Sequence, residues 1–375
     1  MQTIKIGYDT YNASHKKELA SGFQYNEYLN LFNPIVNPST ANGKYFYPIY
    51  FPWAWDNEPT ISKIVINDIK TGKCKLVIDY ITESECYNND DYVLYPELDD
   101  YEAYPESRDF HKKVFSMLEN NNLDWDFVFI DCNPHNETTY DNCIYLNRWL
   151  YQQFTHLSFE NERQYDFSSF NRRVTRSRLK ICENLNNKNA LWSCGAIEYH
   201  LDEFGQESRQ DKEWYDPFRD LFHLLPKTVD ADFTAVGLAM PISDWMIPSS
   251  YIHIINETFT FYHEKCLFLT EKTFDCINAR TPFLLVGQPF SLKHLQDLGF
   301  KTFSEFWDES YDEIINTHDR VNKILEVIDE LGKRNIKEVF NSTKPILEHN
   351  REILKTYNSQ YNITLYNRLS NLGFI

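Results

Sequence analysis

The sequence predicts a mixed α/β protein built on parallel sheets. Short apolar, β-branched segments alternate with segments of helical composition, most clearly between Tyr251 and Phe303. Two strand–helix steps within that stretch imply right-handed crossovers and a sheet covered on both faces. The chain has 375 residues, which is enough for two domains of ordinary size.

The N-terminal half shows the same alternation more weakly. The apolar runs predict strands at Thr3–Ile6, Ile61–Ile66, Cys74–Ile81 and Asp126–Ile130, and a helix at Phe110–Leu118. Gly72, within Lys70–Lys73, indicates a hairpin turn between the second and third of these strands. Tyr45–Trp55 is rich in aromatic residues and proline, and predicts an extended segment that either fills the core or lines a binding surface.

The C-terminal half has clearer boundaries. Its predicted strands are Ile252–Ile255, Phe283–Val286 and Phe300–Phe303. The predicted helices are Glu271–Ala279 with Thr270 as N-cap, Leu292–Leu298 with Ser291 as cap, a helix from Thr317 to Gly332, and then Ile336–Phe340, Pro345–Tyr357 and Gln360–Leu372. Proline positions such as Pro282 and Pro345 mark the expected helix boundaries.

The start of the helix at Thr270 is a candidate phosphate site. Ligands of parallel α/β sheets bind beyond the carboxyl ends of the strands, and the free N–H groups and dipole of a helix N-terminus attract anions. Lys272 would add a full positive charge, whereas Glu271 could only accept hydrogen bonds, from ribose or sugar hydroxyls. The alternative is an ordinary first-turn acid beside a solvated lysine.

A second basic segment lies about a hundred residues upstream. Four arginines occur between a predicted strand at Phe167–Phe170 and the body of a predicted helix, Val174–Leu185; they are Arg172, Arg173, Arg176 and Arg178. Guanidinium groups match phosphate oxygens bidentately and keep their charge. The segment therefore predicts a diphosphate site, with a solvated basic patch as the alternative.

Composition excludes several classes. The chain contains no Gly-x-Gly-x-x-Gly, Walker lysine or Gly-x-Ser-x-Gly motif, which argues against classical dinucleotide oxidoreductases, P-loop kinases and α/β hydrolases. The eight cysteines show no zinc-site spacing, and no apolar run approaches a membrane span, so reduced thiols in a cytoplasmic protein are expected. A net charge of −18 repels nucleic acid at long range without excluding a local basic groove.

Several of these residues together resemble a known family. Thr270-Glu271-Lys272, followed by Asn278-Ala279, a proline and an apolar strand ending at Gly287, is similar to the C-terminal signature of the family 10 glycosyltransferases, the α1,3-fucosyltransferases. Asn256-Glu257-Thr258 and Leu298–Phe303 resemble fucosyltransferase-like proteins of phage genomes, so the likeness covers about the second half of the chain. The Lys272–Pro282 spacing and Asp275-Cys276 depart from the pattern. The resemblance therefore bears on the fold more than on the sugar or base specificity.

The resemblance implies a GT-B fold, in which two Rossmann-like domains face each other across a cleft. It implies an acceptor-side α/β domain at residues 1–160, a nucleotide-sugar-binding domain at 161–345, and C-terminal helices at 346–375 that cross back to the first domain. The donor would be a UDP- or GDP-sugar, used as co-substrate without a cofactor or metal ion. The implied donor-binding residues are Arg172, Arg173, Arg176, Glu257, Thr270, Glu271 and Lys272.

The acceptor side is less defined. An inverting GT-B enzyme needs a general base from its first domain; Asp131 and His135 are the candidates chosen by position, with Asp9 and Glu137 as further ones. No glutamate lies eight residues after Glu257, Glu264 or Glu271, as it would in the glutamate pair of many retaining enzymes, which favours inversion. The acceptor would be the hydroxyl of a glycan or of a hydroxymethylated pyrimidine in phage DNA, in the host cytoplasm. The alternative function is a non-catalytic nucleotide-sugar-binding or assembly protein with the same fold.

Overall fold

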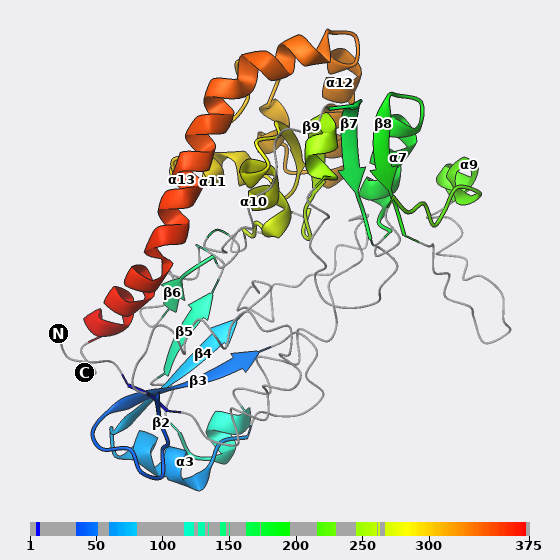
Figure 1. The fold of residues 1–375 in the computed structure, drawn as a ribbon. Helices are drawn as coiled ribbons and strands as arrows, with labels where there is room; N and C mark the ends of the chain where they lie inside the picture. Colours follow the sequence, from blue (N-terminus) through cyan, green and yellow to red (C-terminus); the bar gives the residue numbers. More distant parts are fainter. Residues whose placement is uncertain are drawn as a thin grey trace, which may run out of the picture.

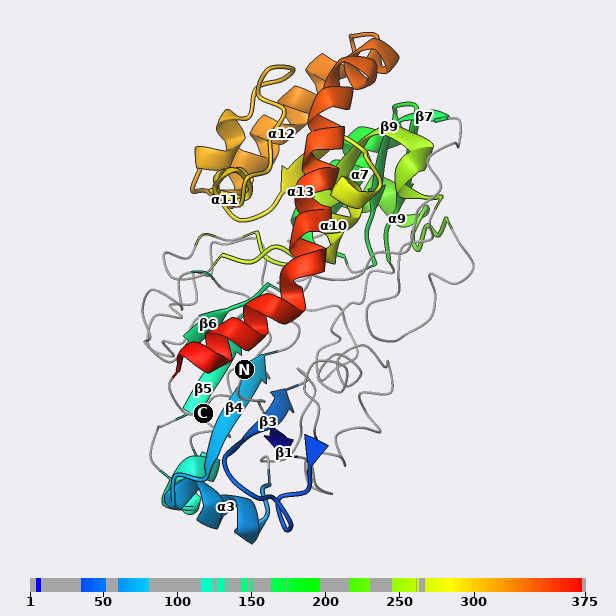
Figure 2. The same ribbon diagram turned by 60° about the vertical axis from the view of Figure 1, so that its left-hand side comes forward.

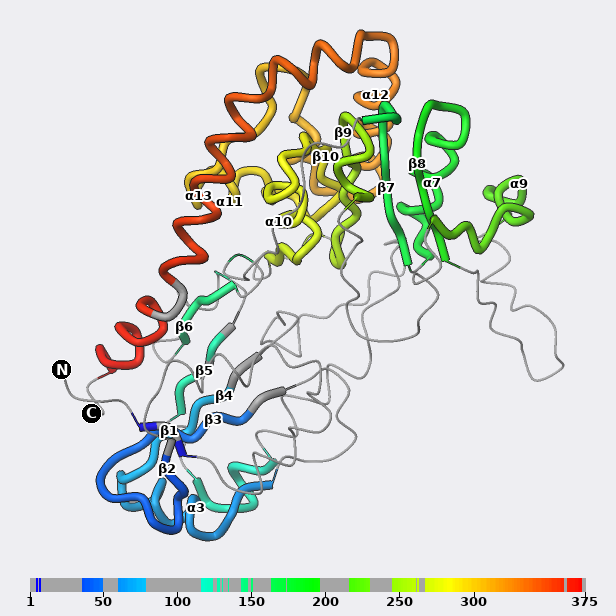
Figure 3. Tube along the Cα trace, in the orientation of Figure 1, coloured from blue at the N-terminus to red at the C-terminus, as the bar shows by residue number. Residues whose placement is uncertain are grey.

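The structure is a computed structural model with two parallel β-sheets and the helices that cover them (Figure 1). It describes residues 5–7, 35–51, 60–80, 116–123, 127–131, 134, 143–147, 150, 163–172, 174–195, 216–229, 245–260, 262 and 267–372. The colours of Figure 3 show that β1–β6 come from the first part of the chain and β7–β10 from the second. The predicted α/β class with parallel sheets is therefore confirmed.

The first sheet has six parallel strands within the described residues, in the order β2, β1, β3, β4, β5, β6. Their bounds are β1 Ile6–Gly7, β2 Ile35–Val36, β3 Tyr45–Phe51, β4 Cys74–Tyr80, β5 Phe127–Asp131 and β6 Cys143–Tyr145. The aromatic segment that begins at Tyr45 is thus a strand of the core, because Tyr45, Phe46 and Tyr47 are buried.

Two predictions in this half are wrong. Ile61–Ile66 is not a strand but leads into helix α3, Lys63–Lys70. Lys70–Lys73 is therefore no hairpin turn between two strands but the connection from α3 to β4, which pairs in parallel with β3. Ser62 caps the helix by accepting a hydrogen bond from the N–H of Val65 at 3.3 Å. The β-branched residues resemble strand composition, but Val65 is buried while Ile64 is exposed, so the segment presents a single helical face to the sheet.

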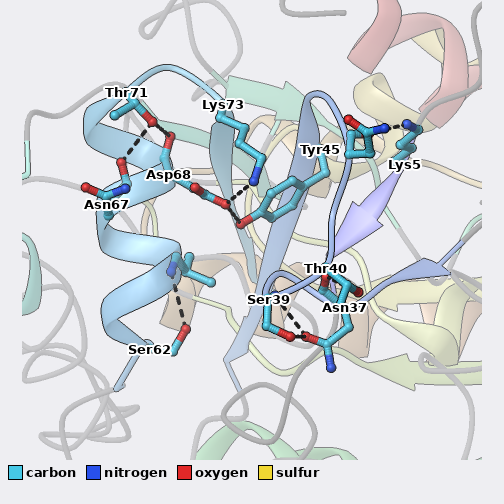
Figure 4. A network of polar contacts seen from close by, with 12 residues as sticks. Lys5, Asn37, Ser39, Thr40, Tyr45, Ser62, Asn67, Asp68, Thr71 and Lys73 are labelled. Atoms are coloured by element: carbon cyan, nitrogen blue, oxygen red, sulfur yellow. Dashed lines mark hydrogen bonds and ion pairs between the residues drawn. The ribbon is translucent and has the colours of Figure 1, made fainter.

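A buried carboxylate joins this helix to the first sheet (Figure 4). The hydroxyl of Tyr45 donates to Oδ2 of Asp68 at 2.8 Å, and Nζ of Lys73 lies 3.1 Å from the same oxygen. Gly7 is required opposite this tyrosine, because a Cβ on Gly7 would lie 2.5 Å from the Tyr45 ring. These contacts set how closely α3 packs against the sheet and how closely β1 approaches the Tyr45 ring.

The second sheet has four parallel strands within the described residues, in the order β10, β9, β7, β8. The strand bounds are β7 Tyr165–Phe170, β8 Ala190–Ser193, β9 Ser250–Asn256 and β10 Phe283–Val286. The α-helices are α7 Arg176–Asn186, α9 Arg219–Phe222, α10 Glu271–Asn278, α11 Ser291–Asp297, α12 Thr317–Leu331 and α13 Ile336–Asn371. Short 3-10 helices are η1 Asp216–Phe218, η3 Ile247–Ser249 and η4 Ser310–Glu313.

Three predictions in this half are wrong. Ser291 does not cap its helix: α11 begins at Ser291, Phe290 holds the N-cap position, and the Ser291 hydroxyl donates to the carbonyl of Gln288 at 2.7 Å. Phe300–Phe303 is not a strand: both phenylalanines are buried, but the backbone N–H and C=O of Lys301 pair with the side chain of Asn350, at 2.7 and 2.8 Å, instead of with a sheet. The three predicted C-terminal helices are one continuous helix, α13, which contains Pro345.

Cys182, Cys194 and Cys276 are buried free thiols, as the sequence predicts.

The long helix α13 runs past both sheets. It packs against α10 and β9, and Figures 1 and 2 both show its last turns beside β5 and β6. Leu365 and Leu369 in those turns are fully buried. No helix in the described part of the chain combines the length and apolarity needed to cross a membrane.

Candidate functional site

The candidate site lies at the carboxyl edge of the second sheet. Because β7, β9 and β10 are parallel, their exits at Asn171, Glu257 and Gly287 lie on one edge. Helix α7 follows β7, and the N-cap of α10, Thr270, is hydrogen-bonded to Glu257. Two helix N-termini therefore begin at the edge where ligands of parallel sheets bind.

Glu257 fixes the start of α10. Its side chain is buried and accepts hydrogen bonds from the N–H of Thr270 at 3.1 Å, the hydroxyl of Thr270 at 2.5 Å and the hydroxyl of Thr273 at 2.5 Å. Its own N–H donates to the carbonyl of Val286 at 2.9 Å, beside the end of β10. Glu257 thus has a positioning role, and its predicted contact with a ligand stays a prediction.

The ammonium group of Lys272 is held over the same helix start. Nζ donates to the hydroxyls of Thr270 at 3.0 Å and Thr258 at 3.3 Å, and lies 3.2 Å from Oε1 of Glu271. The hydroxyl of Thr270 also caps the helix by accepting from the N–H of Lys272 at 3.4 Å. A full positive charge and the free N–H groups of the first turn therefore lie together.

Glu271 and Lys272 are both partly accessible, with 25% of each side chain exposed. Lys272 is therefore not simply a solvated lysine, since two hydroxyls and a carboxylate orient it. Glu271 is at once a first-turn acid and the ionic partner of Lys272. Its predicted contact with ribose or sugar hydroxyls stays a prediction.

One arginine of the basic segment reaches this cluster. Nη2 of Arg178, on α7, donates to the backbone carbonyl of Glu257 at 3.3 Å, and Thr175 caps α7 by accepting from the N–H of Arg178 at 3.2 Å. Arg172 is exposed, Arg176 is half-buried, and Arg173 lies outside the described residues. The structure thus joins the basic segment to Glu257 through Arg178, the one of its four arginines that is not in the implied donor-binding set.

Two buried amides at the same edge were also missed. Asn171 and Asn256 both donate through Nδ2 to the hydroxyl of Ser169, at 3.2 and 2.9 Å, and Ser169 donates to the carbonyl of Ile254 at 3.1 Å. Within the described part of the chain, Oδ1 of each asparagine is buried without a hydrogen-bond partner. These oxygens are hydrogen-bond acceptors at the ends of β7 and β9. The sequence signal for both asparagines was their position directly after a predicted strand.

The predicted catalytic residues belong to the first sheet. Asp131 ends β5 and is paired in register with Tyr145 of β6; His135 lies outside the described residues. The end of β6 and the residues after it contact the second half of the chain: the hydroxyl of Tyr145 lies 3.2 Å from Nε2 of His294 on α11, and Nδ2 of Asn147 donates to the carbonyl of Leu269, before α10, at 3.0 Å. The edge that ends in Asp131 is therefore next to the start of α10.

Among the described residues, no group of three or more His, Cys, Asp or Glu side chains is arranged to hold a metal ion.

No family model and no curated protein matches the sequence. Three solved structures of α1,3-fucosyltransferase resemble the chain weakly. One crystal structure is 10% identical with a TM-score of 0.39, and one with GDP is 9% identical with a TM-score of 0.38; each match covers 96% of this chain and 90% of the other. One with GDP-fucose is 12% identical, with a TM-score of 0.31 and coverage of 95% and 90%. Likeness this weak does not assign a function to the chain.

Proposed function

We propose that this chain is a glycosyltransferase of the GT-B type that binds a nucleoside diphosphate sugar, UDP- or GDP-linked, at the N-terminus of α10. The observation that carries the proposal is the position of Lys272. Its ammonium group is oriented by Thr258 and Thr270 over a helix start, at the carboxyl edge of a parallel sheet. In such folds this edge is where ligands bind.

The charges around this edge fit a diphosphate. The N-terminus of α10 offers backbone N–H groups, and Lys272 adds a positive charge; Arg178 ties the basic start of α7 to Glu257. Arg172 and Arg176 belong to the same segment, and Arg173 completes the proposed set. Positive groups at these positions would stabilise the diphosphate as it leaves with the electron pair of the sugar–oxygen bond. The proposed transfer uses no metal ion or cofactor.

The transfer itself would be a single displacement with inversion. The acceptor hydroxyl attacks the anomeric carbon, the bond from that carbon to the diphosphate breaks, and the hydroxyl proton passes to a general base. Asp131 is proposed as this base because it ends β5 on the edge next to α10, with His135 as the second candidate. In this proposal residues 1–160 form the acceptor-side domain, 161–345 the donor domain, and 346–375 cross back.

The proposed acceptor is a glycan hydroxyl. The net charge of −18 opposes binding to DNA at long range, so a hydroxymethylated pyrimidine of phage DNA remains the second acceptor to test. Binding of a nucleotide sugar without release of nucleoside diphosphate in the presence of either acceptor would favour the non-catalytic alternative.

The proposal is tested by thermal shift with a panel of UDP- and GDP-sugars. We expect at least one nucleotide sugar to raise the melting temperature of the wild type. Lys272→Met should weaken that binding about 10- to 100-fold, because a charge-assisted hydrogen bond contributes about 1.5–3 kcal/mol; Arg172→Ala should weaken it less.

The matched control is Lys293→Met. Lys293 also lies in the first turn of a helix, α11, but it is exposed and paired with Asp297. This variant should bind as the wild type does. If no nucleotide sugar stabilises the wild type, or if both lysine variants lose affinity equally, the proposed donor site is wrong.

A further inference from the structure

The loops that follow β9 and β10 carry an exposed aromatic pair, Tyr262 and Phe290. The two side chains are 39% and 40% exposed, and their rings meet edge to face with centroids 6.4 Å apart. A second aromatic pair, on the loop after β9, is less exposed: Phe259 contacts Phe268, which is fully buried. Core packing therefore accounts for Phe268 but not for the outer pair.

Phe290 is held in a strained conformation. Its φ of 67° and ψ of 12° lie in the left-handed region, where a bulky residue is rarely found and which a glycine would occupy freely. The N–H of Phe290 donates to the carbonyl of Asp312 at 2.7 Å, and the carboxylate of Asp312 accepts from the N–H groups of Leu292 and Lys293 at 2.9 and 3.1 Å. The surroundings thus enforce the strain, yet the ring gains little burial from it. Strain of this kind is typical of functional positions.

Both loops are fixed to one guanidinium group. Arg320 on α12 is buried and donates through Nε to the carbonyl of Gly287 at 3.0 Å, and through Nη2 to the carbonyl of Thr260. Thr260 lies two residues before Tyr262, and Gly287 three residues before Phe290. The aromatic pair therefore projects from two loops that are held together at their bases.

The pair lies within reach of the proposed phosphate site. Thr258, which contacts the Lys272 ammonium group, is four residues from Tyr262, a span of at most about 14 Å. On the other side, the N–H of His294 donates to the carbonyl of Phe290 at 2.9 Å, one helical turn away, and the His294 ring contacts Tyr145 of the first sheet. Tyr262 thus lies within about 14 Å of Thr258, and Phe290 lies one helical turn from the contact between α11 and the first sheet.

We propose that the Tyr262–Phe290 pair binds the planar base of the donor nucleotide by stacking, an inference that rests on the proposed function. With the diphosphate at Lys272, the four-residue step from Thr258 to Tyr262 limits the separation between the charged end and the base to about 14 Å. An edge-to-face pair leaves ring surface free for a third ring. Because every base has a π face, this contact serves purine and pyrimidine nucleotides alike.

The test compares nucleotides with a ligand that has no base. Dissociation constants of UDP, GDP and inorganic pyrophosphate are measured by calorimetry for the wild type, Phe290→Gly, Tyr262→Leu and Tyr262→Phe. Stacking contributes about 1–3 kcal/mol per base, so Phe290→Gly and Tyr262→Leu should bind UDP and GDP about 5- to 150-fold more weakly. Pyrophosphate binding should change less than about twofold, and Tyr262→Phe, which keeps the ring, should bind as the wild type does.

Phe290→Gly also separates a binding role from a structural one. Glycine tolerates the backbone conformation, so this variant should melt at or above the wild-type temperature while it loses nucleotide affinity. Trp245→Leu is the control, since Trp245 is an exposed aromatic residue that precedes β9 at the opposite edge of the sheet.

One result would overturn the stacking site alone, and another would overturn the donor site as well. Unchanged UDP and GDP binding in both ring variants, while Lys272→Met loses affinity for all three ligands, would overturn the stacking site and leave the donor site intact. That result would also follow if the rings faced the acceptor. Failure of the wild type to bind any of the three ligands would overturn the proposed function and, with it, this inference.

Discussion

His253, in the central strand β9, is a buried histidine whose role is structural. Its Nδ1 lies 2.7 Å from the hydroxyl of Ser168, which in turn lies 2.5 Å from the hydroxyl of Ser250, and its ring packs against Phe170. Burial lowers the pKa of His253 to about 3. The imidazole is therefore neutral at all pH values at which the protein is expected to function.

This histidine makes folding sensitive to acid. The unfolded chain binds a proton near the ordinary histidine pKa of about 6.5, whereas the folded protein does not until about pH 3. Unfolding therefore takes up a proton between these values, and stability is lost as the pH falls. We expect His253 to account for about 2 kcal/mol of the loss between pH 7.5 and 5.

The measurement is urea unfolding of the wild type and His253→Gln at both pH values. The variant should lose about 2 kcal/mol less on acidification, because all other titrating groups are shared. Identical pH dependence in the two proteins would show that His253 is protonated in the fold.

Residue-level prediction was right where the contact is local. Thr270 was correctly predicted as the N-cap of α10 because a capping residue and its helix are adjacent in sequence. Arg178 was named in the basic segment but left out of the implied donor set, since its acceptor is a carbonyl 79 residues away. Asn171 and Asn256 were missed because the hydroxyl that joins them, on Ser169, becomes their shared neighbour only when β7 pairs with β9.

Among the elements, α12 packs its apolar face into the core and is hydrogen-bonded to the loops at the sheet edge through Arg320. Besides Gly287 and Thr260, its guanidinium group donates to the carbonyls of Ile314 and Ile315, at 2.6 and 3.1 Å. Four carbonyl groups therefore accept from one side chain, which also holds the two loops of the aromatic pair; the carbonyl of Thr260 accepts in addition from the hydroxyl of Thr317 at 3.1 Å.

We expect Arg320→Met to destabilise the protein by at least about 3 kcal/mol, because each buried carbonyl left without a donor costs about 1–3 kcal/mol. Arg334→Met is the matched control, since Arg334 is exposed and donates to the carbonyl of Phe306 at 2.5 Å; it should change stability by less than about 1 kcal/mol. Urea unfolding measures both. Equal losses in the two variants would contradict the assigned role of Arg320.

Helices and strands were likewise predicted correctly where the signals are local in sequence. The predicted strands at β7, β9 and β10 and the helix α10 are confirmed, because short apolar runs bounded by caps and proline have one plausible structure. Ile61–Ile66 was misassigned because β-branched residues also occupy the buried face of α3. Phe300–Phe303 was misassigned because the partner of its backbone, Asn350, comes from a helix about fifty residues later in the chain.

In the whole molecule, the two sheets meet where the proposed site lies. Asn147, after β6, is buried and donates to the carbonyl of Leu269, one residue before the N-cap Thr270. Sequence patterns predicted the α/β class. They did not predict the order of the strands in either sheet, because that order depends on pairings between distant segments. The division into an acceptor and a donor domain stays a prediction.

Binding of a nucleoside diphosphate sugar at the start of α10 can be seen in a crystal structure of the protein soaked with the nucleotide sugar that stabilises it best. We expect a diphosphate whose oxygens lie within about 3.2 Å of the Lys272 ammonium group and the first N–H groups of α10. A nucleotide sugar bound elsewhere, with Lys272 still paired only with Thr258, Thr270 and Glu271, would contradict this expectation.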